Sequence, residues 1–248
     1  MPINGEYAFI GAAGIGFGAW MISTGLQRRR LQSAIESLPT SKVAEMMPGL
    51  VELTGKAAAA TPSTDPIFGK PCLFHRIQIW EYRFVGTGRN MRREWVSIHF
   101  EDTTRPFWLE DETGRAFILP YGAEARYKTN VRWESGQSEA DPALKRFVTS
   151  TAGDPGNPIR LAASIIRQGD PFFVLGWACP AEESIKTAAP TDSPLCVQAS
   201  PKVPMQIADV SEREVLSAVA TGATNWLGLG TLAILAGLTI LGLALGLF

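Results

Sequence analysis

The stretch from residue 224 to residue 248 limits what this chain can fold into more than any other feature. It carries no charged side chain and consists mostly of Leu, Gly, Ala and Ile. The hydrocarbon core of a bilayer is about 30 Å thick, so a helix needs about 20 mostly apolar residues to cross it. We therefore predict a transmembrane helix at residues 224–248.

A second uncharged run covers residues 7–27. Ahead of it lies a short tail, residues 1–6, in which Glu6 is the one charged side chain, and behind it come Arg28, Arg29 and Arg30. This order is the reverse of a signal peptide, in which basic residues precede a short apolar core. We therefore predict a second transmembrane helix at residues 7–27, so that both ends of the chain anchor the part between them.

The three arginines also predict an orientation. Lys and Arg close to a span favour the cytoplasmic side of a membrane. We therefore expect a two-pass protein whose central domain is cytoplasmic and whose two termini lie on the opposite side. In that position Arg28, Arg29 and Arg30 are candidates for contact with lipid head groups or with a partner.

Both apolar runs carry small residues four positions apart, a spacing that lets helix backbones approach closely in lipid. The pattern predicts that the two spans pack together or that they drive homo-oligomers. The alternative is that glycine is simply frequent in membrane helices. The residues concerned are Gly14 with Gly18, Ala233 with Gly237, and Gly242 with Gly246.

Composition excludes several classes of function. Lys and Arg number 23 against 24 Asp and Glu, so no basic excess predicts binding to nucleic acid. The three Cys and two His include no CxxC pair. A zinc site built from four closely spaced Cys and His ligands is therefore not expected, and we predict neither a metal nor a cofactor.

Between the spans, residues 28–48 predict a helical collar at the membrane surface, broken near Pro39. The apolar period then changes to two, which is typical of strands. Ser211 and Glu214 form a capping box that starts a helix at 211–223, and the Pro- and Ser-rich residues 180–202 predict an exposed loop. Strands are expected at 49–57, 72–82, 94–101, 106–110, 115–119, 123–133, 171–179 and 205–208, and a short helix at 141–149. The apolar residues of 160–167 fit either a strand or a helix, and we favour a strand.

Short strands at regular spacing argue for an α+β fold that is mostly antiparallel β. We expect residues 49–210 to form a meander that curls into a small barrel or sandwich, flanked by the two transmembrane helices. The large aromatic residues of this region are expected in its core. Trp80 in particular shares a strand face with Cys72, Phe74 and Tyr82.

Cys72, His75 and His99 are candidates for catalysis, since a nucleophilic cysteine needs a base within hydrogen-bond reach. On a strand, however, residues three apart point to opposite faces, so Cys72 and His75 cannot pair without a bulge. His99 on a neighbouring strand remains a possible partner for either. The alternative is that all three residues are structural, as buried thiols usually are.

Two polar features remain. The carboxylates of 101–102 and 110–112 lie on adjacent predicted turns, where they either hold a divalent cation or simply shape polar hairpins; the spacing matches no calcium loop. Arg89, Arg92 and Arg93 form a basic loop that either touches anionic lipid heads or is a solvated hairpin tip.

Several motifs follow one another in a recognisable order: LVELTG at 50–55, PIFGKPCLFHR at 66–76, Trp95, PFWLEDETGRA at 106–116, GAE at 122–124, GD at 169–170 and VLG at 174–176. This order resembles the GIDE domain, also called the BAM (beside-a-membrane) domain. That domain occurs in outer-membrane E3 ubiquitin ligases of the MAPL/MULAN type and in shorter prokaryotic membrane proteins.

In the ligases a zinc-binding RING follows the second span, but three Cys and two His cannot supply its eight ligands. The topology of these relatives also implies a domain in the intermembrane space, in conflict with Arg28, Arg29 and Arg30, and we keep the cytoplasmic prediction. We expect a non-catalytic GIDE/BAM-like module that binds a protein partner or senses the state of the membrane. The alternatives are a ligase scaffold that needs a separate RING protein, or a Cys/His hydrolase.

Overall fold

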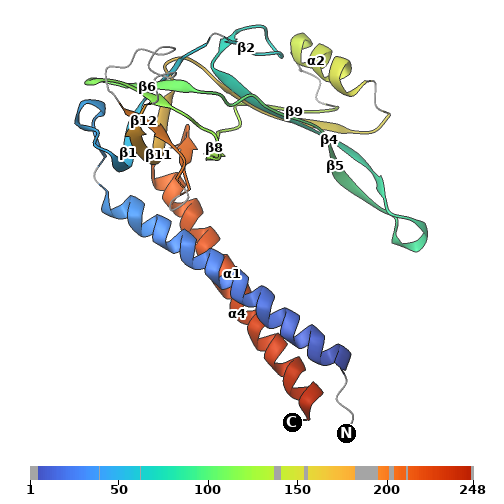
Figure 1. The fold of residues 1–248 in the computed structure, drawn as a ribbon. Helices are drawn as coiled ribbons and strands as arrows, with labels where there is room; N and C mark the ends of the chain where they lie inside the picture. Colours follow the sequence, from blue (N-terminus) through green and yellow to red (C-terminus); the bar gives the residue numbers. More distant parts are fainter. Residues whose placement is uncertain are drawn as a thin grey trace. The chain divides into compact units, whose positions relative to one another are not determined.

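The computed structural model describes residues 5–38, 40–61, 63–136, 141–153, 156–181, 195–200, 204–210 and 212–246 (Figure 1). The chain divides into two compact units. The first contains Met1–Leu38 and Ser211–Phe248, and the second contains Pro39–Val210. Ser211, the predicted helix cap, lies outside the described residues.

The first unit is a pair of long helices, α1 (Gly5–Ser37) and α4 (Glu212–Leu245). They run antiparallel, because Gly11 faces Leu241 at one end and Arg28 reaches Gly222 at the other. Helix α1 continues without a break from the predicted span into the predicted collar. Helix α4 likewise joins the predicted juxtamembrane helix and the final span.

Both helices are long and apolar enough to span a membrane, over Gly5–Arg30 and Ala220–Leu245. Within their apolar windows only 22% and 17% of the residues are buried. The outer faces expose large side chains such as Phe9 (76% exposed) and Leu232 (63%). Contiguous exposed apolar surface of this kind marks contact with a membrane or with another protein.

The second unit contains a closed five-stranded barrel. Around it run β1 (Gly49–Ala59), β6 (Phe107–Asp111), β7 (Gly114–Ile118), β12 (Leu195–Gln198) and β11 (Pro171–Pro180), and β11 pairs with β1 to close the ring. The barrel is mixed, since β7 and β12 are parallel and the other pairs are antiparallel. Two further strands, β13 (Gln206–Ala208) and β8 (Glu124–Arg126), extend the sheet beyond β11.

Strand β1 closes the barrel because it pairs with different neighbours along its length. Residues 49–56 pair with β11, and residues 56–59 pair with β6. Gly55 lies at the crossover, where a β-carbon would stand 2.5 Å from the carbonyl oxygen of Glu110. A glycine is therefore required here, because any side chain would push β6 away.

The barrel core is apolar and rich in phenylalanine. Phe107 and Phe172 lie at a centroid distance of 5.2 Å, and Phe74 joins them at 5.7 Å and 6.0 Å. Their rings are at most 1% exposed, as is Leu53. The alternation expected of half-buried strands thus points one set of side chains inward around the whole ring.

A second sheet lies beside the barrel in the same unit. It is antiparallel, with the order β5 (Arg92–Asp102), β4 (Phe74–Val85), β10 (Ile159–Ile166) and β9 (Val131–Glu134). Helix α2 (Pro142–Ala152) covers one face, where Leu144 and Val148 pack against a set of isoleucines that includes Ile77 and Ile79. Asp141 caps α2 as expected, since its carboxylate accepts a hydrogen bond from the Ala143 amide at 2.8 Å. The short elements are η1 (Val43–Glu45), η2 (Gly88–Asn90), β2 (Ser63–Thr64) and β3 (Pro71–Cys72).

The α+β, mostly antiparallel fold predicted from the sequence is confirmed, and it is a barrel. Three details of the prediction were wrong. The single strand expected at 123–133 is two strands in different sheets, β8 and β9. Residues 195–198, within the stretch 180–202 expected to be a loop, form β12, a strand of the barrel, while residues 182–194 and 201–203 lie outside the described residues. The predicted core row is also split, because Phe74 and Cys72 are buried whereas Trp80 and Tyr82 lie half-buried outside the barrel core.

Candidate functional site

The second sheet has one covered face and one open face. Along β4, the side chains of Ile77 and Ile79 point toward α2. Side chains alternate along a strand, so those at even-numbered positions such as Trp80 and Tyr82 point to the opposite face of the sheet. A β-bulge in β5 opposite Ile79 and Trp80 leaves Ile98 without a direct partner on β4. The rings on the open side are half-buried, so part of each remains available for contact.

On this open side, arginines stack on aromatic rings in a continuous row. The guanidinium carbon of Arg160 lies 5.0 Å from the Trp80 ring centroid and 4.6 Å from that of Trp95. Tyr82 lies beside Trp95 at 5.2 Å, and farther along the hairpin another arginine covers an exposed phenylalanine at 4.5 Å. We call this surface the aromatic–arginine face; it consists of Trp80, Tyr82, Phe84, Arg93, Trp95 and Arg160.

The strand register explains why these side chains meet. Arg160 is the direct cross-strand partner of Trp80, and Tyr82 that of Trp95. Directly opposed residues on one face bring their β-carbons to about 4.5–5.5 Å, within reach of long and aromatic side chains. Each cation–π contact contributes about 0.5–2 kcal/mol, more where water is excluded. The face is therefore held in shape before any ligand arrives.

A pocket of about 420 Å³ opens at the end of this face, beside the short strand β9. Arg132 and Arg160 line it together with Trp80, Trp133 and one carboxylate, that of Glu134, which is the β9 partner of Arg160. The indole nitrogen of Trp133 is buried and has no hydrogen-bond acceptor among the described residues. Arginine presents a planar fork of donors that matches a carboxylate, so the pocket suits an anionic group carried on an apolar or aromatic frame.

The predicted basic loop forms the tip of the β4–β5 hairpin, the long projecting arm of the second sheet in Figure 1. Arg89, Arg92 and Arg93 are all exposed there. Arg92 is paired with Glu94 at 3.0 Å. Two apolar side chains stand beside them, Phe84 and Met91, each 56% exposed.

The arginines at 28–30 lie in α1 of the helix pair. Arg28 is half-buried, and a β-carbon on Gly222 would stand 2.9 Å from its guanidinium nitrogen. Arg29 and Arg30 are exposed. Arg28 is thus engaged with the opposite helix, and its two neighbours are the ones available for contact outside the pair.

The small residues of the predicted spans lie largely in the contact between α1 and α4. A β-carbon on Gly18 would stand 2.7 Å from the carbonyl oxygen of Gly230, and one on Gly14 would stand 3.4 Å from the α-carbon of Gly237. The same β-carbon on Gly14 would stand 3.7 Å from the carbonyl oxygen of Ala233. Gly242 is also buried, whereas Gly246 is exposed and would have no atom within 4 Å of an added β-carbon.

Cys72 is separated from both candidate bases. Burial raises the pKa of its thiol, partly offset by a hydrogen bond with Ser63. His75 instead lies 3.1 Å from Glu101, and His99 lies 3.7 Å from the other oxygen of the same carboxylate. Among the described residues His75 is thus hydrogen-bonded to Glu101, the His99 Nε2 atom has no hydrogen-bond partner, and neither imidazole has a recorded hydrogen bond to Cys72.

The acidic turns are used to hold the fold. Asp111 accepts hydrogen bonds from the amides of Val43, Thr113 and Gly114 and from the Thr113 hydroxyl. Burial acts to raise its pKa, but these donors outweigh it and the pKa lies below the usual range. Asp102 binds Arg76 at 2.7 Å. Among the described residues no three Cys, His, Asp or Glu side chains are placed to hold a metal ion.

Sequence reasoning missed Arg160, Arg132 and Tyr82 as members of a surface. The period-two pattern of β4 contained the signal, because aromatic residues recur at every second position from Trp80 to Phe84. The pattern alone does not say which side a helix will cover. Arg160 lies far along the chain and meets Trp80 only through strand pairing.

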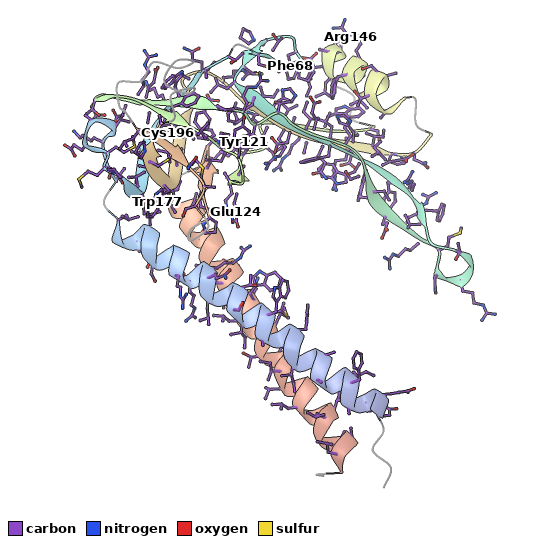
Figure 2. The ribbon with its side chains drawn as sticks, in the orientation of Figure 1. Phe68, Tyr121, Glu124, Arg146, Trp177 and Cys196 are labelled. Carbon is purple, nitrogen blue, oxygen red and sulfur yellow. The ribbon has the colours of Figure 1, made fainter. Side chains whose placement is uncertain are left out.

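Figure 2 shows how densely side chains populate the second unit around its two sheets. No protein-family model matches the chain, and no match was found among curated proteins or among solved structures. The resemblance to the GIDE/BAM domain therefore stays a prediction made from the motifs.

Proposed function

We propose that this protein is a two-pass membrane protein whose GIDE/BAM-like domain binds a partner protein. The aromatic–arginine face is the proposed binding surface, and an acidic, extended segment of the partner is the proposed occupant. The observation that carries the proposal is the position of Arg160, stacked between Trp80 and Trp95 on an open sheet face. Trp, Tyr and Arg are the residues that most often dominate the energy of protein interfaces.

Charge supports an acidic occupant. Within the described residues no ion pair is recorded for Arg132, Arg160 or Arg93; Arg160 and Arg93 contact aromatic rings, and one carboxylate, that of Glu134, lines the pocket beside Arg132 and Arg160. The three arginines therefore leave an excess of positive charge on this face for an acidic segment. Trp80, Tyr82 and Trp95 are half-buried and already packed against Arg160 or each other, which lowers the entropic cost of ordering the interface. The pocket of about 420 Å³ would take one side chain of the bound segment.

The membrane part of the proposal rests on the helix pair. Two helices of sufficient length, with exposed Phe9 and Leu232, support a double crossing of the bilayer. Arg29 and Arg30 at the end of the first apolar run support a cytoplasmic domain and termini on the opposite side. This orientation is tested with single cysteines introduced at exposed positions of the central domain. A membrane-impermeant maleimide added to intact cells should leave these cysteines unlabelled if the domain is cytoplasmic.

The hairpin tip supports an additional contact with lipid. Exposed Phe84 and Met91 stand among Arg89, Arg92 and Arg93. Apolar side chains that enter the head-group layer, flanked by cations that bind its phosphates, are the chemistry of a membrane-surface contact. This contact would keep the domain near the bilayer and orient its binding face.

Photo-crosslinking in the native membrane tests the binding proposal. A photoreactive residue at Ser97, which is exposed and pairs with Trp80, is expected to form an adduct with another protein. Mass spectrometry should place the adduct in an Asp- and Glu-rich segment, and Arg160→Glu should abolish it. A photoreactive residue at exposed Arg146 on α2 is the matched control and should not give the same adduct (Figure 2).

The binding proposal fails if the Ser97 adduct persists in Arg160→Glu, or if its partner is a lipid or a second copy of this chain. Once the bound segment is known, binding can be tested with purified components. A synthetic peptide of that sequence should change the tryptophan fluorescence of the full-length protein in detergent. A peptide in which Asp and Glu are replaced by Asn and Gln should leave the fluorescence unchanged.

A further inference from the structure

Two of the three cysteines lie directly opposite one another in the barrel. Cys179 on β11 and Cys196 on β12 are cross-strand partners in an antiparallel pair, and their sulfur atoms are 3.7 Å apart. Both are thiols in this structure. We infer that Cys179 and Cys196 form a reversible disulfide site, which goes beyond the proposed binding function and does not depend on it.

The backbone geometry accommodates the bond. Directly opposed residues in an antiparallel pair have α-carbons about 4.5 or 5.5 Å apart. Disulfides span α-carbon separations of about 4.4–6.8 Å, so no strand has to move. Rotation of the side chains is enough to bring sulfurs at 3.7 Å into bonding distance.

The surroundings of the pair favour a defined order of reaction. Both side chains lie on the outside of the barrel, because the flanking residues Ala178, Leu195 and Val197 point into its core. Cys196 is only 2% exposed and packs with Trp108 and Phe117, whereas Cys179 is half-buried. Cys179 is therefore the thiol that an external reagent reaches, and Cys196 is the one that resolves the product.

The chemistry is thiol–disulfide exchange with a small disulfide such as oxidised glutathione. The Cys179 thiolate attacks one sulfur of the reagent, forms a mixed disulfide and releases one glutathione thiolate. The Cys196 thiolate then attacks the Cys179 sulfur and releases the second glutathione. Two protein thiols become one disulfide, the reagent is reduced to two thiols, and the two protons pass to the released thiolates.

The third cysteine provides an internal control. Cys72 lies in the core beneath α2, with Ser63 as its hydrogen-bond partner, and it is 4% exposed. Cytosolic disulfides are usually transient and redox-sensing, and those in oxidising compartments are lasting. The pair therefore responds to the redox state of whichever compartment holds the domain.

The experiment uses the full-length protein in detergent, equilibrated with mixtures of reduced and oxidised glutathione. Remaining thiols are blocked with N-ethylmaleimide, and tryptic peptides are analysed by mass spectrometry. Cleavage after Lys186 separates the two cysteines, so that a disulfide appears as a linked peptide pair. We expect the linked fraction to rise with the share of oxidised glutathione, to vanish with dithiothreitol, and to leave Cys72 blocked by the maleimide.

Cys196→Ser separates the two steps. It should accumulate glutathione on Cys179, because the resolving thiol is missing, while Cys179→Ser should form neither product. The inference is overturned if the wild-type protein keeps glutathione on Cys179 without linking the pair, or if no linked peptide forms in the most oxidising mixture. It is also overturned if Cys72 is linked as readily as Cys179.

Discussion

Gly237 of α4 lies against Gly11 of α1, so closely that a β-carbon on Gly237 would stand 2.7 Å from the Gly11 carbonyl oxygen. Without aqueous solvent to drive apolar helices together, close backbone contact of this kind is a main source of helix association in lipid. The pairing is made within one chain. It occupies Gly14, Gly18 and Gly237, three of the small residues that the sequence also made candidates for homo-oligomerisation.

Replacing Gly237 with leucine should separate the helices. Overpacking costs about 1–3 kcal/mol, which corresponds to about a tenfold loss of association for each 1.4 kcal/mol. Association is measured as disulfide formation between cysteines placed at Trp20 and Trp226, whose rings are 5.6 Å apart, with the link identified by peptide mass. Gly16→Leu is the control, since no atom lies within 4 Å of a β-carbon there, and an equal loss in this variant would refute the packing argument.

Gly55→Ala should destabilise the barrel. The added methyl group would meet the Glu110 carbonyl oxygen at 2.5 Å, and backbone cannot move aside as a flexible side chain would. We expect a loss of about 1–3 kcal/mol in the free energy of unfolding, measured by denaturant titration of the circular dichroism signal. Gly156→Ala, which meets no atom within 4 Å, should change stability by much less; equal effects would contradict this account of β1.

Asp111→Asn should make the stability of the fold less dependent on pH in the acidic range. The native pKa of Asp111 is lowered by its four donors, so the ionised carboxylate stabilises the fold at pH values above the unfolded pKa, about 3.9. That contribution is lost as pH falls through the lowered native pKa. Thermal midpoints of wild type and variant should therefore differ most near neutral pH and begin to converge as pH falls below the unfolded pKa of about 3.9. A difference that stays constant over this range would show that the hydrogen bonds act without the charge.

Arg160→Met should weaken both the sheet and the binding surface. The methionine keeps much of the apolar stem but loses the cation above Trp80 and Trp95, at a cost of about 1–2 kcal/mol in unfolding free energy. Arg132 lines the same pocket but has no recorded contact with an aromatic ring, so Arg132→Met should change the free energy of unfolding only slightly. Both variants should reduce the Ser97 adduct, because each removes a charge proposed to face the acidic segment.

Cys72 should react slowly with iodoacetamide at neutral pH. Burial raises its pKa, which lowers the fraction of reactive thiolate, and the fold shields the sulfur as well. Peptide mass spectrometry should show much faster labelling after unfolding in guanidinium. Rapid labelling of Cys72 in the folded protein would instead favour the alternative of a Cys/His hydrolase.

The sequence predicted the strands that carry a local apolar signal, and missed one that depends on its neighbours. Strand β4 alternates over twelve residues, and β11 contains a continuous apolar run between turn residues, so each can be recognised in a short window. Strand β12 has four residues in a region rich in Pro and Ser. It is a strand because β11 and β7 hold it from both sides, which no local pattern records.

The candidate surface was predictable only in part. Alternation along β4 places Trp80 and Tyr82 on one side of the strand, but the sequence does not reveal that α2 covers the other side. A row of aromatic residues was therefore interpreted as core. The pairing of Arg160 with Trp80 depends on the register between β10 and β4, and the contact of Cys179 with Cys196 depends on the register between β11 and β12. The sequence does not reveal either register.

The sequence by itself determined the two long apolar helices and the β-rich character of the region between them. Hydropathy and period are properties of a few neighbouring residues, so they can be read without knowing the fold. The tertiary structure alone decided that β1 and β11 close a barrel, that one face of the second sheet stays open, and that two thiols meet. These features follow from strand register and from which faces are buried together, and both are set by contacts between residues far apart in the chain.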